Sequence, residues 1–121
     1  MRILVTGGCG FIGSNFIRYV LQARKNMEVV NLDLLTYAGN LRSLLDVEEM
    51  YSDRYRFVRG DIREKEFLRR VFETFEIESV AHFAAESHVD RSILGPEVFV
   101  QTNVYGTFNL LAAVRSELQS E

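Results

Sequence analysis

The sequence predicts an α/β fold in which a parallel, doubly wound sheet carries helices on both faces. Short apolar runs with the length of buried strands alternate with stretches whose apolar residues recur at helical spacing. A glycine-rich turn joins the first apolar run to the first helical stretch. The chain has 121 residues and is 47% hydrophobic, which is enough for one buried core. Alternation of this kind implies right-handed crossovers and therefore parallel strands.

The first segment predicts a strand, a glycine turn and a helix that together bind a dinucleotide pyrophosphate. Residues 3–5 fit a strand buried on both faces, and Gly7, Gly10 and Gly13 follow it with GxxGxxG spacing. Gly8 also completes a GxGxxG pattern, so the spacing does not separate subfamilies. The apolar residues of the helix recur at Phe16, Ile17, Val20 and Leu21. Free amides and the positive end of the helix dipole favour an anion there, as in a Rossmann-like fold.

The second predicted strand, residues 28–33, ends on an acid in the position that binds a ribose. Asp33 lies twenty residues after Gly13, the separation at which a carboxylate meets the ribose hydroxyls. A 2′-phosphate about 4 Å away would be repelled by about 4 kcal/mol per unit charge at an effective dielectric near 20. No arginine directly follows Asp33, so we expect NAD rather than NADP. The alternative is a plain tight turn with Asp33 as a strand-end cap.

Two further strands are predicted at residues 55–60 and 79–83. The expected spatial order is 3-2-1-4, which is the first half of a doubly wound sheet. A complete sheet of this class continues beyond four strands, so the fold is expected to be truncated, with residues 79–83 at an open edge. We therefore expect one NAD-binding Rossmann half-domain over residues 1–121.

Three further helices complete the predicted alternation. One carries apolar residues at Phe67, Leu68, Val71, Phe72 and Phe75. A short helix before Met50 is expected to be capped by Asn40. The last helix is expected to start at Pro96 and to run to about Ser116. Its sheet-facing side is expected to hold Val100, Val104, Phe108, Leu111 and Val114. The residues expected partly off that side are Phe99, Tyr105 and Leu110.

Charge and cysteine content exclude several classes of function. The net charge is −3 and the arginines are spread among acidic residues, which argues against a nucleic-acid surface. The single cysteine, Cys9, excludes an intramolecular disulfide, and no cluster of ligands predicts zinc. Cys9 lies within the glycine turn, where we expect packing rather than thiol chemistry. No apolar run approaches about 18 residues, so we expect no membrane span and a cytoplasmic protein.

Three segments resemble the extended short-chain dehydrogenases. Residues 6–13 are similar to the cofactor turn of that family. Residues 33–40 and 82–92 are more specific and resemble the dTDP-glucose 4,6-dehydratases, and residues 36–40 separate these from related epimerases and decarboxylases. The resemblance covers the whole chain but only the N-terminal part of the family's length. It implies NAD as cofactor, dTDP-glucose as the nucleotide-sugar substrate, and dehydration by internal hydride transfer.

Carried over residue by residue, the resemblance adds cofactor contacts to those of the glycine turn. The full set is Gly7, Gly10, Phe11, Ile12, Gly13, Asp33, Leu34, Leu35, Thr36, Asp61, Ile62, Phe83, Ala84, Ala85, Glu86, Ser87 and Thr102, with Ser87 also a substrate contact. Asp61 is expected to accept from the adenine amine, or alternatively to cap a helix. Ala84 and Ala85 would allow close backbone approach, or alternatively pack tightly. His82 is expected to be a hydrogen-bonded strand residue, while His88 follows the cofactor strand and has either a substrate-facing or a structural role.

No catalytic residue and no metal ligand is predicted within the chain. The resembling family uses a tyrosine and a lysine four residues apart, together with an Asp-Glu pair, and none of the five tyrosines here has a lysine at that spacing. We therefore expect no turnover by this chain alone. We expect a homo-oligomer built through the open edge and the last helix, with aggregation as the alternative. The alternative functions are part of another NAD-dependent nucleotide-sugar epimerase and a non-catalytic NAD-binding module.

Overall fold

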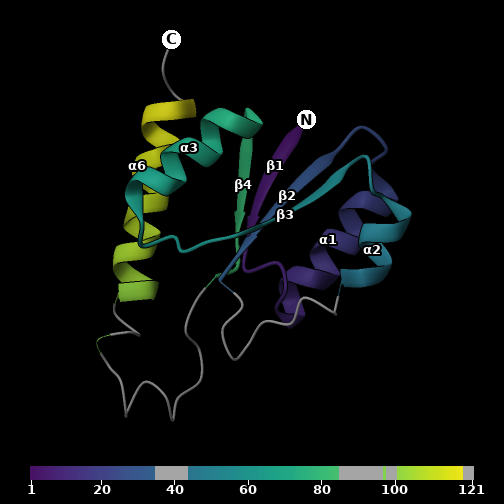
Figure 1. The fold of residues 1–121 in the computed structure, drawn as a ribbon, viewed down its shortest axis with the longest axis horizontal. Coiled ribbons are helices and arrows are strands. Elements are labelled where there is room, and N and C mark those ends of the chain that lie inside the picture. The colour runs from purple at the N-terminus through teal and green to yellow at the C-terminus, as the bar shows by residue number, and fades with distance from the viewer. Residues whose placement is uncertain (35–43, 85–96, 98–100, 119–121) are drawn as a thin grey trace.

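A parallel four-stranded sheet forms the centre of the computed structural model, which describes residues 1–34, 44–84, 97 and 101–118. The strands are β1 (Arg2–Thr6), β2 (Glu28–Asp33), β3 (Tyr55–Arg59) and β4 (Ser79–His82). Their order, β3-β2-β1-β4, confirms the predicted one (Figure 1). The register pairs Thr6 with His82 and Asp33 with Arg59. The carboxyl ends of all four strands therefore meet at one edge of the sheet.

Helices lie on both faces of this sheet, as crossovers between parallel strands require. The helices are α1 (Phe11–Ala23), α2 (Leu45–Met50), α3 (Lys65–Phe75) and α6 (Thr107–Leu118). Figure 1 shows α1 and α2 on one side of the sheet and α3 and α6 on the other. A π-helical segment, η2 (Gln101–Gly106), leads directly into α6. Within the described part of the chain, every helix is too short or too polar to span a membrane.

The central strand β1 is buried on both sides, as its continuous apolar run predicts. Ile3 and Val5 pack with residues of α1 and α2, whereas Leu4 packs with residues of α3 and α6. Leu4 and Val5 are completely buried. This alternation divides the core into two apolar clusters, one on each face of the sheet. The strand ends that face the candidate site are thus held from both sides.

The face that α6 turns toward the protein differs from the predicted one. The residues expected against the sheet that are instead at least 60% exposed are Val104, Phe108 and Leu111. Leu110 is 3% exposed and joins the core, and Val114 packs partly against it as expected. The cause is η2, because a π-helical turn contains more residues than an α-helical turn and rotates every following position. Phe99 and Val100 lie outside the described residues.

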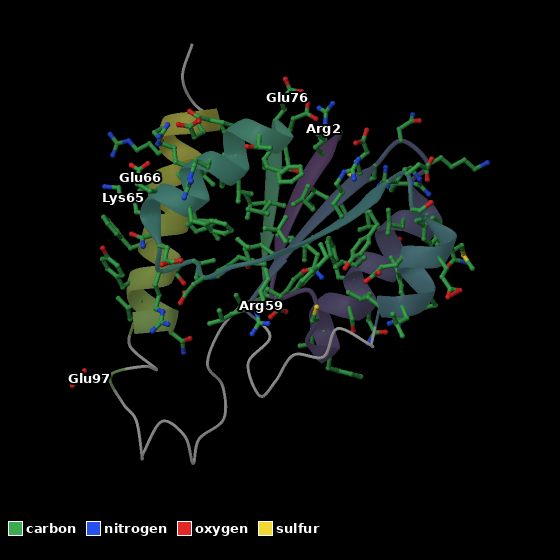
Figure 2. The ribbon with its side chains drawn as sticks, viewed as in Figure 1. Arg2, Arg59, Lys65, Glu66, Glu76 and Glu97 are labelled. Atoms are coloured by element: carbon green, nitrogen blue, oxygen red, sulfur yellow. The ribbon has the colours of Figure 1, made fainter. Side chains whose placement is uncertain are left out.

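Other boundaries also differ slightly from the predictions. Helix α2 begins at Leu45, with Leu44 in the N-cap position, so it starts later than a helix capped by Asn40 would. Asn40 itself lies outside the described residues. Charged side chains project from the outside of the fold (Figure 2). Arg2 forms an ion pair of 3.7 Å with Glu76 at the amino end of the sheet, whereas Arg59 lies at the carboxyl end.

Candidate functional site

The glycine turn after β1 has a backbone that tolerates no side chain at two positions. Gly7 has a φ of +70°, a conformation that favours glycine. A Cβ on Gly7 would lie 2.6 Å from the amide nitrogen of Ala84, and one on Gly13 would overlap the carbonyl oxygen of Gly7. The turn is therefore packed directly against the start of α1 and against the chain that leaves β4.

The start of α1 presents unpaired amides to the carboxyl edge of the sheet. The first hydrogen bond within the helix runs from the Ser14 amide to the Gly10 carbonyl, so the amides of Phe11, Ile12 and Gly13 have no acceptor in the helix. The first turn of α1 contains no acidic residue that would neutralise the dipole. Phe11 and Ile12 are 83% and 66% exposed, so the surface beside these amides is open. This combination fits a pyrophosphate group.

Asp33 is fixed to the glycine turn at the end of β2. Its Oδ2 accepts a hydrogen bond of 2.8 Å from the Cys9 amide, and the residue is 8% exposed. The bond sets the orientation of the carboxylate relative to the turn, which is what a ribose-binding acid requires. Leu34 follows and is about one-third exposed. Leu35 and Thr36, the next predicted contacts, lie outside the described residues.

A buried polar residue that the sequence analysis did not single out, Asn31, packs beneath this turn. Asn31 Nδ2 donates to the Tyr55 hydroxyl at 3.0 Å and to Cys9 Sγ at 3.5 Å. Asn31 Oδ1 has no hydrogen-bond partner among the described residues and lies against Gly8, where a Cβ would overlap it. An asparagine within an otherwise apolar strand was the available signal in the sequence.

The Cys9 thiol is part of the packing of the turn, in agreement with the prediction. The side chain is 2% exposed. Burial, followed by the negative charge of Asp33, raises the pKa of the Cys9 thiol to about 12. The thiol is therefore protonated at neutral pH and is a poor nucleophile.

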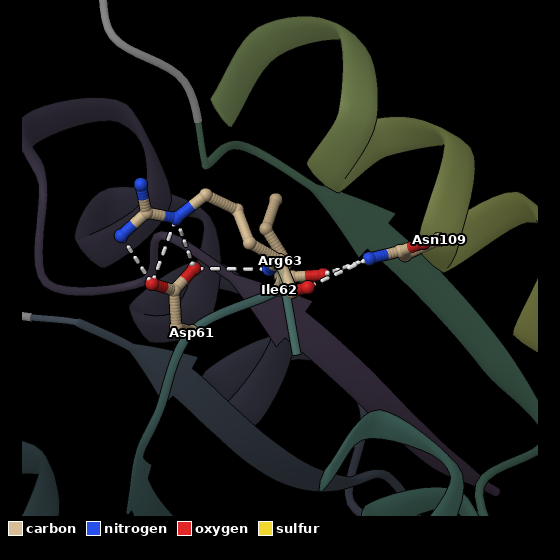
Figure 3. Close-up of polar contacts among 4 residues, drawn as sticks. All are labelled: Asp61, Ile62, Arg63 and Asn109. Atoms are coloured by element: carbon tan, nitrogen blue, oxygen red, sulfur yellow. Dashed lines mark hydrogen bonds and ion pairs between the residues drawn. The ribbon is translucent and has the colours of Figure 1, made fainter. Parts of the chain in front are cut away.

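The predicted adenine contacts lie in the loop between β3 and α3 (Figure 3). Asp61 is held by Arg63, whose backbone amide donates to Oδ1 at 2.9 Å and whose Nη2 donates to Oδ2 at 2.6 Å. Arg63 Nε adds bonds of 3.0 and 2.8 Å to the two oxygens. Burial raises the pKa of the Asp61 carboxyl, but the bonds from Arg63 outweigh it and the pKa is lowered. Asp61 does not cap α3, because the N-cap residue is Glu64.

The same loop is tied to α6 by a buried asparagine. Asn109 is 1% exposed, and its Nδ2 donates to the carbonyl oxygens of Ile62 and Arg63 at 3.2 and 2.9 Å (Figure 3). Asn109 Oδ1 has no partner among the described residues. Ile62 is 5% exposed and belongs to the apolar core. The backbone of the predicted adenine loop is thus positioned by α6, which lies far from it in the sequence.

The chain that leaves β4 is attached to the end of β1. The Thr6 hydroxyl oxygen accepts hydrogen bonds from the amides of Phe83 and Ala84 at 3.1 and 3.3 Å. The ring of Phe83 packs against that of Phe16, with centroids 5.2 Å apart. These contacts bring residues 83 and 84 beside the glycine turn. The predicted contacts Ala85, Glu86 and Ser87 lie outside the described residues, as does His88. Thr102 lies in η2, and its side chain is not among those described.

A cationic residue that the sequence analysis did not consider lies at the same edge. The β2–β3 register pairs Arg59 with Asp33, and Figure 2 shows Arg59 at the carboxyl end of the sheet. Arg59 is exposed. No arginine follows Asp33 along the chain, but the neighbouring strand supplies one. The signal was its place at the carboxyl end of the third predicted strand, next to Gly60.

Taken together, the described residues fit a bound dinucleotide better than a metal. The glycine turn, the free amides of α1 and the Asp33 carboxylate lie at one edge, and backbone contacts hold them in place. Among the described residues no group of three or more histidine, cysteine, aspartate or glutamate side chains could hold a metal ion. The donor set is suited to phosphate and hydroxyl groups.

Comparison with known proteins agrees with this assignment. The family model of GDP-mannose 4,6 dehydratase matches residues 4–121. A probable dTDP-glucose 4,6-dehydratase of Sinorhizobium fredii is 56% identical over 115 residues, which are 95% of this chain and 32% of that protein. The dTDP-glucose 4,6-dehydratase of Salmonella typhimurium is 50% identical over 115 residues, which are 95% of this chain and 31% of that protein. The chain therefore spans about a third of the length of these curated relatives.

Solved structures give the same result. The dTDP-glucose 4,6-dehydratase of Streptomyces venezuelae, with NAD and TYD bound, is 50% identical with a TM-score of 0.87, over 97% of this chain and 36% of that one. The UDP-glucose 4-epimerase of Thermus thermophilus, in complex with NAD, is 36% identical with a TM-score of 0.82, over 97% of this chain and 34% of that one. The fold is thus shared with epimerases, while the higher identity with the dehydratases confirms the resemblance carried by residues 33–40 and 82–92. Because the family model covers nearly the whole sequence, the chain belongs to the GDP-mannose 4,6-dehydratase family.

Proposed function

We propose that residues 1–121 are the NAD-binding Rossmann half-domain of a dTDP-glucose 4,6-dehydratase. The observation that carries the proposal is the Cys9–Asp33 hydrogen bond, which joins a pyrophosphate-binding turn to a ribose-binding acid at one sheet edge. The identities of 50–56% with dTDP-glucose 4,6-dehydratases support it. NAD, when bound, supplies the hydride acceptor of the reaction. The residues of this chain bind and orient it.

Each part of the cofactor has proposed contacts within the chain. The amides of Phe11, Ile12 and Gly13 hold the pyrophosphate, and the carboxylate of Asp33 accepts from the adenosine ribose. Leu34, Leu35 and Thr36 continue along that ribose. The carboxylate of Asp61 and the backbone of Ile62 lie beside the adenine. Residues 83–87 pass under the nicotinamide ribose, with Thr102 as a further contact.

The proposed role of Asp61 brings the adenine amine beside Arg63. Arg63 donates three hydrogens to the carboxylate: that of its backbone amide, one from Nη2, and the single Nε hydrogen, which is shared between the two oxygens. A carboxylate has about four acceptor positions, so one position remains for the adenine amine. The side chain of Arg63 is 30% exposed and can adjust as the amine approaches.

The substrate proposed for the whole protein is dTDP-glucose, with Ser87 as a contact from this chain. A tyrosine and lysine at the family's spacing are absent from the printed sequence. We therefore propose that these 121 residues bind cofactor without turning over substrate. The second candidate function is the same part of a nucleotide-sugar epimerase, which the TM-score of 0.82 with such an enzyme favours.

Calorimetric titration with NAD and NADP tests the proposed cofactor site. We expect NAD to bind more tightly, because Asp33 accepts from free ribose hydroxyls and repels a 2′-phosphate. Asp33→Asn removes the charge with little change of shape and should reduce the preference. Equal affinity of the unmodified protein for both cofactors, or an unchanged preference in the variant, would contradict the assignment of Asp33.

We also propose that the protein self-associates through η2 and α6. The exposed apolar residues of this segment are Val104, Tyr105, Phe108 and Leu111. An apolar row of this kind is typical of an interface between copies of a chain. Light scattering across a concentration series should give a mass above 13.9 kDa that reaches a plateau. A mass that stays at the monomer value contradicts this proposal, and one that grows without a plateau indicates aggregation instead.

A further inference from the structure

We propose that His82 is a positioning residue for the cofactor, acting as a neutral imidazole protonated on Nε2 that orients the Thr6 hydroxyl. The inference rests on the proposed NAD-binding function, since the segments that it joins are proposed cofactor contacts. It goes further because it gives the imidazole a defined tautomer and a defined effect on binding.

The hydroxyl of Thr6 determines the tautomer. Its oxygen accepts from the Ala84 amide at 3.3 Å and, at 3.1 Å, shares the hydrogen of the Phe83 amide with the Thr6 carbonyl oxygen, which lies 2.9 Å from that amide. Its single hydrogen is left for the His82 ring, whose Nδ1 lies 2.6 Å away. Nδ1 must therefore be the acceptor, and the ring proton of neutral His82 is on Nε2.

The other ring nitrogen is used as this assignment requires. His82 Nε2 lies 3.0 Å from the Thr107 hydroxyl oxygen at the start of α6, so it donates to that oxygen. Thr6 is completely buried, and His82 sits between it and the helix. Partial burial lowers the pKa of the His82 imidazole. The neutral ring is thus the form that the protein favours at neutral pH.

We call the hydrogen bonds that link Thr107, His82 and Thr6 the relay. The relay holds together two segments that are proposed to touch the cofactor. Thr6 directly precedes Gly7, and the space beside Gly7 is filled by the backbone of Ala84. When Thr6 presents its lone pairs to the amides of Phe83 and Ala84, the pyrophosphate turn and the passage under the nicotinamide ribose keep a fixed separation. Protonation of Nδ1 would remove the acceptor of the Thr6 hydroxyl and turn that hydroxyl away from its present orientation.

Two amide variants separate the two ends of the ring. In His82→Asn the side-chain oxygen can take the place of Nδ1 and accept from Thr6, but the side chain is too short to reach Thr107. In His82→Gln the amide reaches the position of Nε2 and leaves Thr6 without its acceptor. We expect His82→Gln to weaken NAD binding about threefold to tenfold, the range for loss of one net hydrogen bond, and His82→Asn to stay within about twofold. Equal weakening by both variants, or no weakening by His82→Gln, would overturn the proposal.

A pH series adds a readout that a purely structural residue would not move. NAD affinity should fall as the pH drops through the lowered pKa of His82, and this fall should be absent in His82→Asn. The cavity of about 420 Å³ beside His82 contains one other titratable group among its described lining residues, Glu78, whose carboxylate accepts from the Arg2 amide at the far end of β4. Glu78→Gln is therefore the matched control and should keep the pH dependence. Loss of the dependence in Glu78→Gln, or its persistence in His82→Asn, contradicts the role of His82.

Nuclear magnetic resonance tests the relay without relying on the cofactor. The ¹⁵N shifts of the His82 ring in the purified protein at neutral pH should show an unprotonated Nδ1 and a protonated Nε2, and the opposite tautomer would overturn the proposal. Amide exchange at Ala84 should be faster in His82→Gln than in His82→Asn, whereas the Phe83 amide, which also donates to the Thr6 carbonyl oxygen, should change less. If the unmodified protein binds no NAD, the proposed function fails, while these two measurements still decide the relay. The ring shifts alone decide it if His82→Gln fails to fold, because they need no variant.

Discussion

Helices α1 and α6 pack on opposite faces of the same sheet, but different kinds of information decide which side of each helix is buried. In α1 the buried residues include Ile17, Val20 and Leu21, the positions that a constant helical period predicts. In α6 the buried residues are Asn109 and Leu110, and Phe108 and Leu111 of the predicted row are exposed. Helix α1 starts from a glycine turn with fixed geometry, whereas α6 inherits its rotation from the π-helical segment before it. The apolar spacing within a helix is therefore sufficient to predict its buried side only where the start of the helix is fixed.

The largest difference in the free energy of unfolding is expected between alanine variants of two adjacent leucines in α6. Leu110→Ala removes a residue that is 3% exposed and should lower the free energy of unfolding by about 2–4 kcal/mol. Leu111 is 63% exposed, so Leu111→Ala should change it by less than about 0.5 kcal/mol. Denaturant unfolding at low protein concentration measures both, because dilution removes any contribution from self-association. A larger loss of stability in Leu111→Ala than in Leu110→Ala would show that the side of α6 predicted from the sequence is the buried one.

The second effect concerns the fixed start of α1. Gly7→Ala places a side chain at φ +70° and against the backbone of Ala84, which should cost about 1–3 kcal/mol of stability. NAD binding should weaken as well, because the turn can accommodate the methyl group only by moving away from β4. Gln22→Ala, at an exposed position of the same helix, is the control and should leave both quantities unchanged. Calorimetry and thermal unfolding of the two variants make the comparison. Wild-type stability in Gly7→Ala would mean that the turn is not held in this conformation.

The smallest effect is expected from the charge beside Asp33. Arg59 is exposed and lies opposite Asp33 in the sheet register, so Arg59→Ala should increase the preference for NAD over NADP by about twofold to fivefold. Arg56→Ala removes a charge from the same strand, three residues away, and should leave the preference unchanged. Paired titrations at low ionic strength give the greatest sensitivity. An unchanged preference in Arg59→Ala would show that its guanidinium group does not reach the 2′ position.

Most of the sheet and of its cofactor edge could be predicted, because short-range patterns determine them. The alternation of apolar runs gave the order of the four strands, and the spacing from Gly13 to Asp33 gave two parts of the site. The hydrogen bonds of Asn31 and Asn109, and the place of Arg59 opposite Asp33, could not be predicted in this way. Each depends on which side chains face each other across strands or helices that are distant in sequence, and no single segment encodes that arrangement.

The bonds made by Arg63 illustrate a second limit. The family resemblance implies that Asp61 lies beside the adenine, and the side chain lies in the loop that follows β3. The sequence did not indicate that Arg63, two residues later, would donate to both oxygens of the carboxylate. A motif specifies where a group is placed, while its availability depends on neighbours that compete for it.

The close contact between Gly7 and Ala84 limits how this part of the fold can diversify. A Cβ on Gly7 would lie 2.6 Å from the amide nitrogen of Ala84, so the glycine turn and the chain that leaves β4 meet backbone to backbone. The Thr6 hydroxyl adds a side-chain bond to the same segment, but no side chain separates the two backbones at Gly7. Relatives that share this turn and act on different sugars would therefore be expected to differ in segments that do not touch this contact.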